Sequence, residues 1–284
     1  MTLVVVRSLG LVTIQDLGRP GRMHEALPPG GALVRSALVS ANRAAGNADN
    51  TAAIEILGRL VVRAESPVVV ATDTSPAPRT LHPGEELTLS SEPRRVAYLA
   101  LRGGISAPLL LGGRSAHLSA GLGHLLRAGD RLEPAAAPPP AGAPSSAAPP
   151  PAAAPSAAAP SVAADPLDSP DSPIIRVLPG PDLDAFADTA LSLLASAPYR
   201  ILPTSDRVGT RLAGPPLPRR ASHVEQSRPM VRGALEVPRD GAPIVLGPEH
   251  PTTGGYPILA VIASPSLDRF FSVRLGGSIR FLVA

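Results

Sequence analysis

The sequence predicts a mainly β protein with few helices, made of two β lobes. Short apolar or alternating runs recur along most of the chain, and glycine, proline or small polar residues bound them. The 284 residues include 36 prolines and 26 glycines, which supply many turns. Many short strands joined by such turns are typical of barrel-like sheets rather than of alternating strand–helix layers. A segment of biased composition divides the chain into the two lobes.

The N-terminal lobe, residues 1–133, is expected to be a sheet with one helix. Strands are predicted at 3–7, 60–64, 68–72, 86–89 and 95–101, where β-branched or alternating apolar residues cluster. A helix is predicted over 34–45 because Leu38, Ala41 and Ala45 fall on one face. The Gly46-Asn47 pair that follows supplies the left-handed residue that commonly ends a helix.

Residues 134–172 separate the lobes. Positions 134–164 contain only Pro, Ala, Ser and Gly with a single Val, and an acidic stretch punctuated by proline follows. This composition cannot bury enough surface to offset the entropy lost on ordering, so a disordered insertion is predicted. Because the cost of closing a loop grows slowly with its length, the two lobes can still touch.

The C-terminal lobe, residues 173–284, is also expected to be mostly strands. They are predicted at 174–178, 199–202, 234–237, 244–246, 258–263 and 278–283. One helix is predicted to begin at Asp182, because Phe186, Ala190 and Leu194 follow at four-residue spacing.

Composition excludes several kinds of chemistry. The chain has no lysine and no cysteine, which excludes Schiff bases, a P-loop lysine, thiol nucleophiles, disulfides and zinc–thiolate sites. Scattered arginines, a net charge of only +3 and 2% aromatic residues argue against a nucleic-acid surface. No apolar run suits a membrane span, and the early-charged start does not resemble a signal peptide. A cytoplasmic protein is therefore expected.

The histidines show no pattern of a metal site. None is placed at H-x-x-x-H, H-x-H or H-E-x-x-H spacing, so no metal is predicted. Those at positions 24, 117, 124, 223 and 250 are interpreted as solvent or loop residues.

Two loop motifs near the ends of the chain carry the strongest signal. The first covers residues 13–21 and reads TIQDLGRPG, and the second covers residues 251–257 and reads PTTGGYP. Glycine permits positive φ and close backbone approach, so such loops often hold a ligand or make a tight packing contact. We expect these two turns to meet around one cleft between the lobes.

These loops and the motifs between them resemble the biotin-dependent carboxyltransferase family, which includes the C subunit of 5-oxoprolinase and the second subunit of allophanate hydrolase. The similar segments follow the family's order at 13–21, 41–47, 54–58, 98–105, 112–115, 126–130, 205–214, 233–238, 240–243 and 252–257. The resemblance covers nearly the whole chain outside the Pro/Ala segment. It implies a cyclophilin-like β-barrel architecture.

The loops and this resemblance together give the candidate site residues. The predicted catalytic residues, acting through positioning and oxyanion-type stabilisation, are Arg207, Thr252, Thr253 and Tyr256. The predicted substrate-binding residues are Gln15, Asp16, Arg19, Asn42, Arg211, Gly254 and Gly255.

Several of these residues have an alternative structural role. Asp16 and Arg19 suit a turn in which they pair with each other, and Asn42 suits buried hydrogen bonding. Glu55 lies in an apolar run, so it is expected either to pair with an arginine, the favoured role, or to be a functional residue. Arg207 and Arg211 could clamp an anion together or form a salt bridge between the lobes.

The resemblance implies an enzyme subunit. In the 5-oxoprolinase branch of the family, the C subunit acts with a B subunit of related fold and an A subunit to open 5-oxo-L-proline, a small amide, to L-glutamate. The complex uses ATP, no cofactor is expected to bind tightly to this chain, and carboxybiotin is a candidate donor because related domains act on urea with it.

Several positions depart from the family's pattern, and four of them are Val34, His124, Arg228 and Glu236. They motivate a second hypothesis of a different class. In it, the chain is a non-catalytic binding subunit that completes a partner's site or antagonises a kinase inhibitor.

Overall fold

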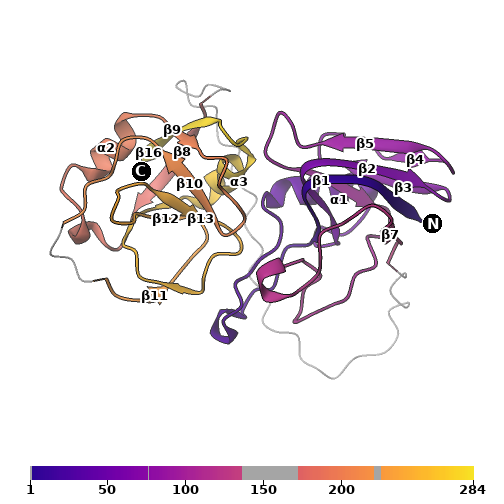
Figure 1. Cartoon of the computed structure of the whole chain (residues 1–284), viewed down its shortest axis with the longest axis horizontal. Helices are drawn as coiled ribbons and strands as arrows, with labels where there is room; N and C mark the ends of the chain where they lie inside the picture. Colours follow the sequence, from indigo (N-terminus) through magenta and orange to yellow (C-terminus); the bar gives the residue numbers. More distant parts are fainter. Residues whose placement is uncertain (1, 76, 136–171, 221–224) are drawn as a thin grey trace.

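Two β structures lie side by side in the molecule and meet along one seam (Figure 1). The computed structural model describes residues 2–75, 77–135, 172–220 and 225–284. The predicted insertion, residues 134–172, falls almost entirely outside the described residues. The prediction of a mainly β fold with few helices is confirmed, since the described residues form two β structures and three α-helices.

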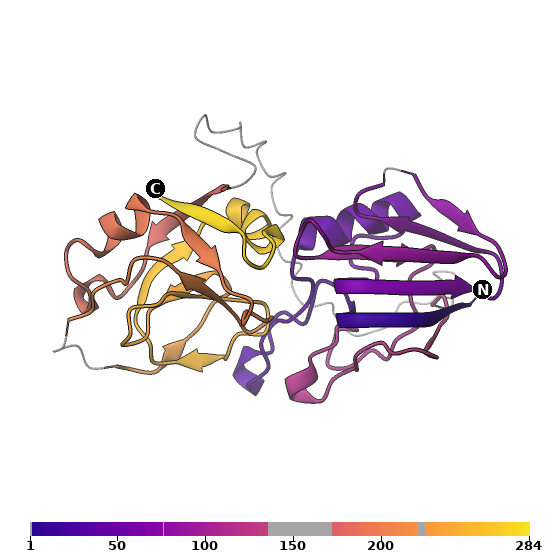
Figure 2. The same cartoon turned by 45° about the horizontal axis from the view of Figure 1, so that its top comes forward.

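The N-terminal half is an open sheet whose strands lie side by side in Figure 2. Its strands are β1 (Leu3–Gln15), β2 (Ala53–Ala64), β3 (Val68–Thr72), β4 (Arg79–Leu81), β5 (Glu86–Ser90), β6 (Ala97–Leu101) and β7 (Arg131–Leu132). The order is β4-β3-β6-β2-β1-β7, with β5 also paired to β2. Strand β1 is longer than predicted and pairs antiparallel with β2 over almost its whole length.

Two glycines allow the long strands β1 and β2 to approach closely at their middle. Gly10 and Gly58 face each other in the register, with φ of +85° and +134°. A Cβ atom at Gly58 would lie 2.2 Å from the carbonyl oxygen of Leu9. Only glycine fits this crossing, because other residues would meet both backbone strain and a clash.

Helix α1 (Arg35–Ala45) covers one face of the sheet, as predicted from the spacing of its apolar residues. Leu38, Ala41 and Ala45 are buried on it, and Gly46 ends it in the left-handed conformation with φ of 78°. Gly46 N–H donates to the carbonyls of the last turn, which satisfies groups that a helix end leaves unpaired.

The C-terminal half is a closed barrel. Its strands are β8 (Ile174–Pro179), β9 (Tyr199–Ile201), β10 (Gly209–Ala213), β12 (Ala234–Glu236), β13 (Ile244–Leu246), β15 (Ile258–Ile262) and β16 (Ser278–Val283), in the order β10-β13-β12-β15-β8-β16-β9. A separate two-stranded ribbon pairs β11 (Arg228–Pro229) with β14 (Thr253–Gly254). Closure removes the free edges that an open sheet of this size would leave.

The helix predicted from Asp182 is wrong in its first half. The chain forms a 3-10 turn at Leu183–Ala185 and becomes extended at Phe186, and α2 begins only later (Ala190–Ser196). Backbone groups here pair across to another segment, since Ala187 N–H donates to Pro218 and Arg220 N–H donates to Ala185. These tertiary hydrogen bonds override the helical spacing.

Helix α3 (Ser264–Ser272) was not predicted from the sequence. It begins with a proline in its first turn, where the missing N–H costs nothing. Its Phe270 and Phe271 are fully buried and belong to the same core cluster as Leu38 and Tyr98 of the sheet half. The two lobes therefore share one apolar core across the seam.

Two further 3-10 turns, Met23–Glu25 and Leu118–Ala120, lie in loops of the sheet half. Among the described residues, no helix is both long enough and apolar enough to cross a membrane.

Candidate functional site

The first loop motif holds another loop of the same lobe in place. Asp16 accepts hydrogen bonds from Gly18 N–H at 2.8 Å and from Arg114 N–H at 2.6 Å. Its own N–H donates to Ser115 Oγ at 2.9 Å, and that hydroxyl donates back to the carboxylate. Asp16 is buried, and its carboxylate is occupied by these donors. The alternative structural role of a turn residue fits it, except that its partners lie in a distant loop.

Arg19 continues this clamp and does not pair with Asp16. Its guanidinium donates to three backbone carbonyls, those of Leu110 at 2.8 Å, Gly113 at 3.2 Å and Ser115 at 2.5 Å. The side chain is buried, so these contacts satisfy a charge that would otherwise be costly to bury. Asp16 and Arg19 thus fix the loop at 110–115 against the end of β1.

That loop presents an apolar hairpin to solvent. Leu109, Leu110 and Leu111 are 63%, 39% and 48% exposed. Leu110 and Gly113 exchange both backbone hydrogen bonds, and the two residues between them have positive φ, as in a type I′ turn. Leucine at such a position is strained, since Asn, Asp and Gly are the usual occupants.

A buried charged cluster joins the two lobes. Arg207 forms ion pairs with Glu55, on β2 of the sheet, and with Glu249, whose carboxylate lies 2.6 Å from Nε. Its third contact is the carbonyl of Gly31 at 2.6 Å. All three charged side chains are less than a tenth exposed. Of the two roles left open for Arg207, the salt bridge between lobes is the observed one, and the arginine partner expected for Glu55 is Arg207.

Tyr98 and His117 lie beside this cluster. The Tyr98 hydroxyl donates to Glu55 at 2.6 Å, and burial, followed by the charge of Glu55, raises the pKa of Tyr98 well above its ordinary value. His117 Nε2 lies 4.0 Å from Glu249, and burial lowers the pKa of His117 although Glu249 opposes the shift. Burial alone would lower the pKa of Arg207, but Glu55 and Glu249 outweigh it and raise the pKa.

A small cavity of about 190 Å³ opens next to the cluster, at the seam between the lobes. Thr13 and Gln15 of β1 line one side, and Arg207 and Glu249 line the other. Gln15 Nε2 donates to Thr13 Oγ1 at 3.0 Å and to the carbonyl of Ala116 at 3.2 Å, which fixes the amide orientation. Gln15 Oε1 is buried and has no hydrogen-bond partner within the described residues, so it is an unsatisfied acceptor beside the cavity.

The expectation that both end motifs share this cleft is wrong. Residues 252–256 do not line the cavity, and β14 pairs instead with β11 at the lower edge of the barrel in Figure 1. Thr252 accepts from Met230 N–H at 3.0 Å through its carbonyl, and Tyr256 is 43% exposed. Gly254 packs against Met230, while Gly255 has open space around it. A catalytic role for Thr252, Thr253 and Tyr256 stays a prediction for a separate surface.

The remaining predicted residues do not reach the cavity. Arg211 lies exposed on β10, four residues from the buried Arg207, so the two arginines form no anion clamp. Its charge faces Glu236, a departure from the family pattern whose pKa is raised by burial and lowered in part by Arg211. Asn42 donates to the carbonyls of Asp49 and Thr51 at 3.3 and 2.7 Å, which is the structural role.

Three residues of the cluster were missed by the sequence interpretation. His117 was treated as a solvent or loop residue, and so was His250, but both are buried and only the loop assignment holds. Glu249 lies two residues before the second motif, and Tyr98 lies in a segment used for the family resemblance. The positions of Glu249 and Tyr98 near recognised motifs were a usable signal. Their pairing with residues far along the chain could not be inferred from the sequence.

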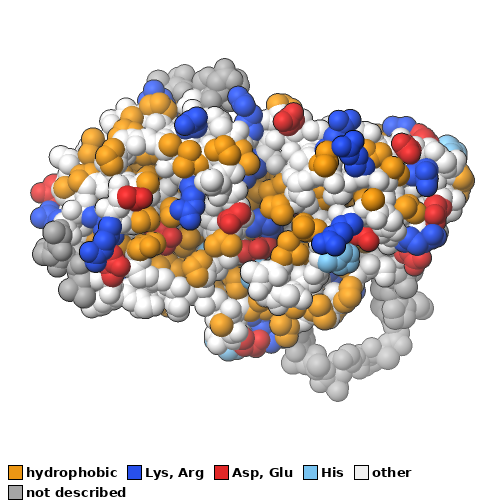
Figure 3. Space-filling model, viewed as in Figure 1, with side chains coloured by type: hydrophobic (Ala, Val, Ile, Leu, Met, Phe, Trp, Pro, Cys, Tyr) orange, Lys and Arg blue, Asp and Glu red, His pale blue; other side chains and the backbone are white. Residues whose placement is uncertain are grey.

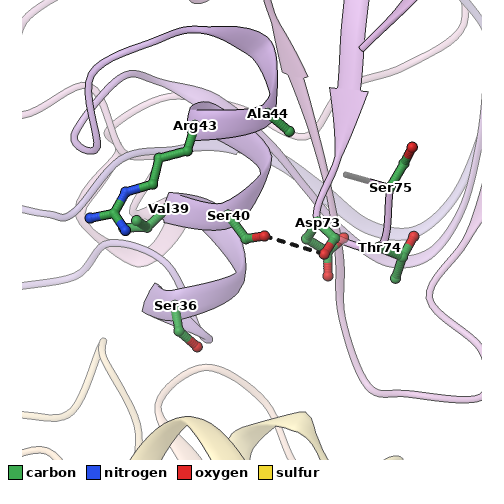
Figure 4. A pocket seen from close by; sticks show the side chains of 8 residues that line it. All are labelled: Ser36, Val39, Ser40, Arg43, Ala44, Asp73, Thr74 and Ser75. Carbon is green, nitrogen blue, oxygen red and sulfur yellow. Dashed lines mark hydrogen bonds between the residues drawn. The ribbon is translucent and has the colours of Figure 1, made fainter. Parts of the chain in front are cut away.

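A second hollow, drawn in Figure 4, lies between α1 and the turn after β3. Its polar lining is mostly hydroxyl groups, and Ser40 Oγ contacts the carbonyl of Asp73 at 3.5 Å. Arg43 points away from Asp73 in the figure and pairs with Asp49. The Asp73 carboxylate is taken up by Tyr98 N–H and Arg94. Both charges are compensated within the chain, so this hollow offers no free charged group.

An open sheet and a closed barrel with buried ion pairs between them make this a two-lobed β protein. Comparison with known proteins specifies it further, because the profile of the family described as "Carboxyltransferase domain, subdomain A and B" matches residues 26–283. The chain belongs to this carboxyltransferase domain family.

Several known proteins are similar over nearly the whole chain. The C subunit of 5-oxoprolinase from Escherichia coli (strain K12) is 31% identical over 99% of this chain and 90% of its own length. The protein of the same name from Haemophilus influenzae is 27% identical over 95% and 87%. The crystal structure of TTHA0988 superposes with a TM-score of 0.80 at 29% identity, over 99% of this chain and 55% of that one. The urea amidolyase of K. lactis shares the fold, with a TM-score of 0.82 at 24% identity over 18% of its length.

Proposed function

We propose that this chain is the carboxyltransferase-type C subunit of an ATP-dependent complex that opens 5-oxo-L-proline to L-glutamate. The observation that carries the proposal is its similarity to the C subunit of 5-oxoprolinase from Escherichia coli, which extends over 99% of this chain and 90% of that protein. A match over both full lengths supports the same kind of subunit better than a shared fold alone, because one fold can host many functions.

The seam cavity is the proposed place of the amide. An amide N–H of the substrate donates to Gln15 Oε1, the buried acceptor that lacks a partner. Arg207 is held in position by Glu55 and Glu249, and three hydrogen bonds to protein acceptors leave two of its five N–H groups for a ligand oxygen.

His117 and Glu249 are the proposed proton-handling pair. Burial keeps the pKa of His117 below its usual value, so the ring is neutral near pH 7 and can accept a proton. Its Nδ1 is buried and has no partner in the described structure, and its Nε2 faces Glu249. A proton taken up by His117 would be stabilised by that carboxylate.

The cofactor and partner assignments belong to the same proposal. Without a lysine the chain offers no P-loop, so ATP is used on a partner subunit. The Gln15 acceptor also fits a ureido N–H, and carboxybiotin is therefore a compatible group donor. The proposed partners are a B subunit of related fold and an A subunit, and the exposed leucine hairpin at 109–111 is the apolar surface that the B subunit would cover. The proposed location is the cytoplasm.

The test is ATP-dependent glutamate formation by the three purified subunits. Replacing Gln15 by Leu removes the acceptor and should lower kcat/KM by roughly 5- to 100-fold, the value of one buried hydrogen bond. The control is Arg280→Gln, an exposed change on β16. Thermal unfolding of each variant confirms that it is folded.

Tyr256→Phe separates the two candidate surfaces. A loss of activity in Tyr256→Phe with full activity in Gln15→Leu would move the site to the 251–257 turn. Complexes that assemble normally and produce no glutamate would contradict the enzymatic proposal and favour the non-catalytic binding subunit.

A further inference from the structure

A second opening between the lobes lies on the other side of Leu11 from the seam cavity. It is a groove of about 830 Å³, lined by five segments that are distant in sequence. The crossing of β1 and β2 at Gly10 and Gly58 forms one wall, and the 91–95 loop forms another. The barrel contributes the loops around Pro203 and Arg274. Figure 3 shows charged side chains recessed along the same seam.

Arg95 is the buried charge of this groove. It is only 4% exposed, and it donates to Thr210 Oγ1 at 2.8 Å and to the carbonyl of Asp206 at 2.9 Å. Both acceptors are uncharged, and within the described residues no carboxylate forms an ion pair with its guanidinium. In the part of the chain that the structure describes, its Nε has no hydrogen-bond partner. Burial lowers the pKa of Arg95 to about 10, although Glu55 and Asp206 oppose the shift.

Arg274 adds an accessible charge at the rim. Its side chain is exposed, and it makes no ion pair within the described residues. The third arginine of the groove, Arg94, is already paired with Asp73 at 2.6 Å. Glu92 is the single acidic residue among those that line the groove. Two arginines are thus left without a carboxylate partner at one opening, and a buried guanidinium in that condition is costly.

Apart from two serines and Glu92, the rest of the groove is apolar. Leu11, Leu57, Pro93, Pro203 and Leu275 line it together with the arginines. A small organic acid can bury its hydrocarbon part against such walls, whereas inorganic phosphate has no apolar part to bury. The charged rim and the apolar walls therefore favour a carboxylate on a short carbon skeleton.

We propose that the groove bounded by Gly58, Arg95 and Arg274 is a binding site for the carboxylate of a small organic acid. The carboxylate pairs with the exposed guanidinium of Arg274, and the buried charge of Arg95 attracts it from the floor. The choice of acid rests on the proposed function, in which both the substrate and the product carry a carboxylate.

The groove is separate from the seam cavity and yet in contact with it. Arg95 lines the groove and donates to the backbone carbonyl of Asp206, while Asp206 and Arg207 line the cavity. Arg207 is already paired with Glu55 and Glu249, so the cavity has little positive charge to offer a carboxylate. The positive charge that a carboxylate needs is therefore found in the groove and not in the neighbouring cavity.

Calorimetric titration of the isolated full chain tests the proposal at constant ionic strength. The ligands are 5-oxo-L-proline, L-glutamate and inorganic phosphate, each in separate experiments. We expect saturable binding of at least one of the two carboxylic acids. The affinity should be at least about tenfold weaker in Arg274→Gln, because this variant loses one charge-assisted contact. Arg280→Gln, an equally exposed arginine outside the groove, should bind as the unchanged protein does.

A second variant probes the floor. Arg95→Gln should weaken binding as well. Circular dichroism and thermal unfolding show whether this variant is folded. If Arg95→Gln does not fold, Arg274→Glu is used in its place. Absence of binding by both acids, binding of phosphate alone, or an unchanged affinity in Arg274→Gln would each overturn the proposal. Glutamate formation by the assembled complex is measured separately, so a failed groove and a failed enzyme assignment give different results.

Discussion

Removing the Arg207 guanidinium tests whether the buried charges hold the lobes together. In Arg207→Met, Glu55 keeps, among the described residues, the hydroxyl of Tyr98 and the N–H of Leu33 as partners, and its side chain is fully buried. Glu249, which is 9% exposed, loses the same partner. Taking one member from a buried ion pair costs about 3–5 kcal/mol, because the remaining charge is left uncompensated.

That loss is large against the ordinary stability of a domain, which is about 5–15 kcal/mol. For a chain of this size it corresponds to a fall in Tm of roughly 6–20 °C. The assays are urea unfolding, with the midpoint and slope both fitted, and scanning calorimetry. Arg280→Met is the matched control, because the same change at an exposed position should cost less than about 0.5 kcal/mol. A loss below about 1 kcal/mol in Arg207→Met would refute the view that this cluster stabilises the seam.

Two further predictions follow from burial and from backbone geometry. Burial lowers the pKa of both His117 and His250 in the folded chain, so the unfolded chain binds more protons. The free energy of unfolding should therefore be highest above about pH 6.5, the ordinary pKa of histidine. It should fall as the pH drops from there through the lower pKa values of the folded state. Urea unfolding at pH 7.5 and 5.5 measures this slope, which should flatten in His117→Gln/His250→Gln; an unchanged slope contradicts the assignment. Gly58→Ala places a Cβ 2.2 Å from the carbonyl of Leu9 at φ of +134° and should cost about 3 kcal/mol or more, whereas Gly255→Ala, with open space around it, should be nearly neutral. Equal urea midpoints for the two alanine variants would contradict the close approach of β1 and β2.

Local patterns predicted the regular elements well where local forces decide them. Helix α1 combines an apolar face with a glycine end, and the structure places it within one residue of the prediction. The helix expected from Asp182 had the same spacing, but its backbone groups found partners near Pro218. Sequence spacing alone cannot reveal such a distant competitor. Helix α3 was missed although Pro265 in its first turn was a readable start signal.

The candidate site was less predictable, because its residues come together only in the folded chain. Glu55 and Arg207 are 152 positions apart, and their pairing joins two lobes whose packing no local pattern encodes. The expectation of an arginine partner for Glu55 was sound on energetic grounds, but many arginines qualified. The glycine-rich turn at 251–257 drew attention by composition, yet its backbone serves a short ribbon with β11. A glycine-rich sequence indicates that the backbone requires a special conformation, and it does not show that the segment lies at a functional site.

The exposed leucine hairpin at residues 109–111 has a consequence for how this protein is produced in a cell. Arg19 and the backbone hydrogen bonds between Leu110 and Gly113 support the observed conformation, in which the leucines are exposed. In the proposed complex a partner subunit covers this hairpin, so copies made in excess of that partner would expose the leucines to water, where they can associate with other apolar surfaces. The need to make the proposed partners in matched amounts then follows from this exposed surface and not from the reaction.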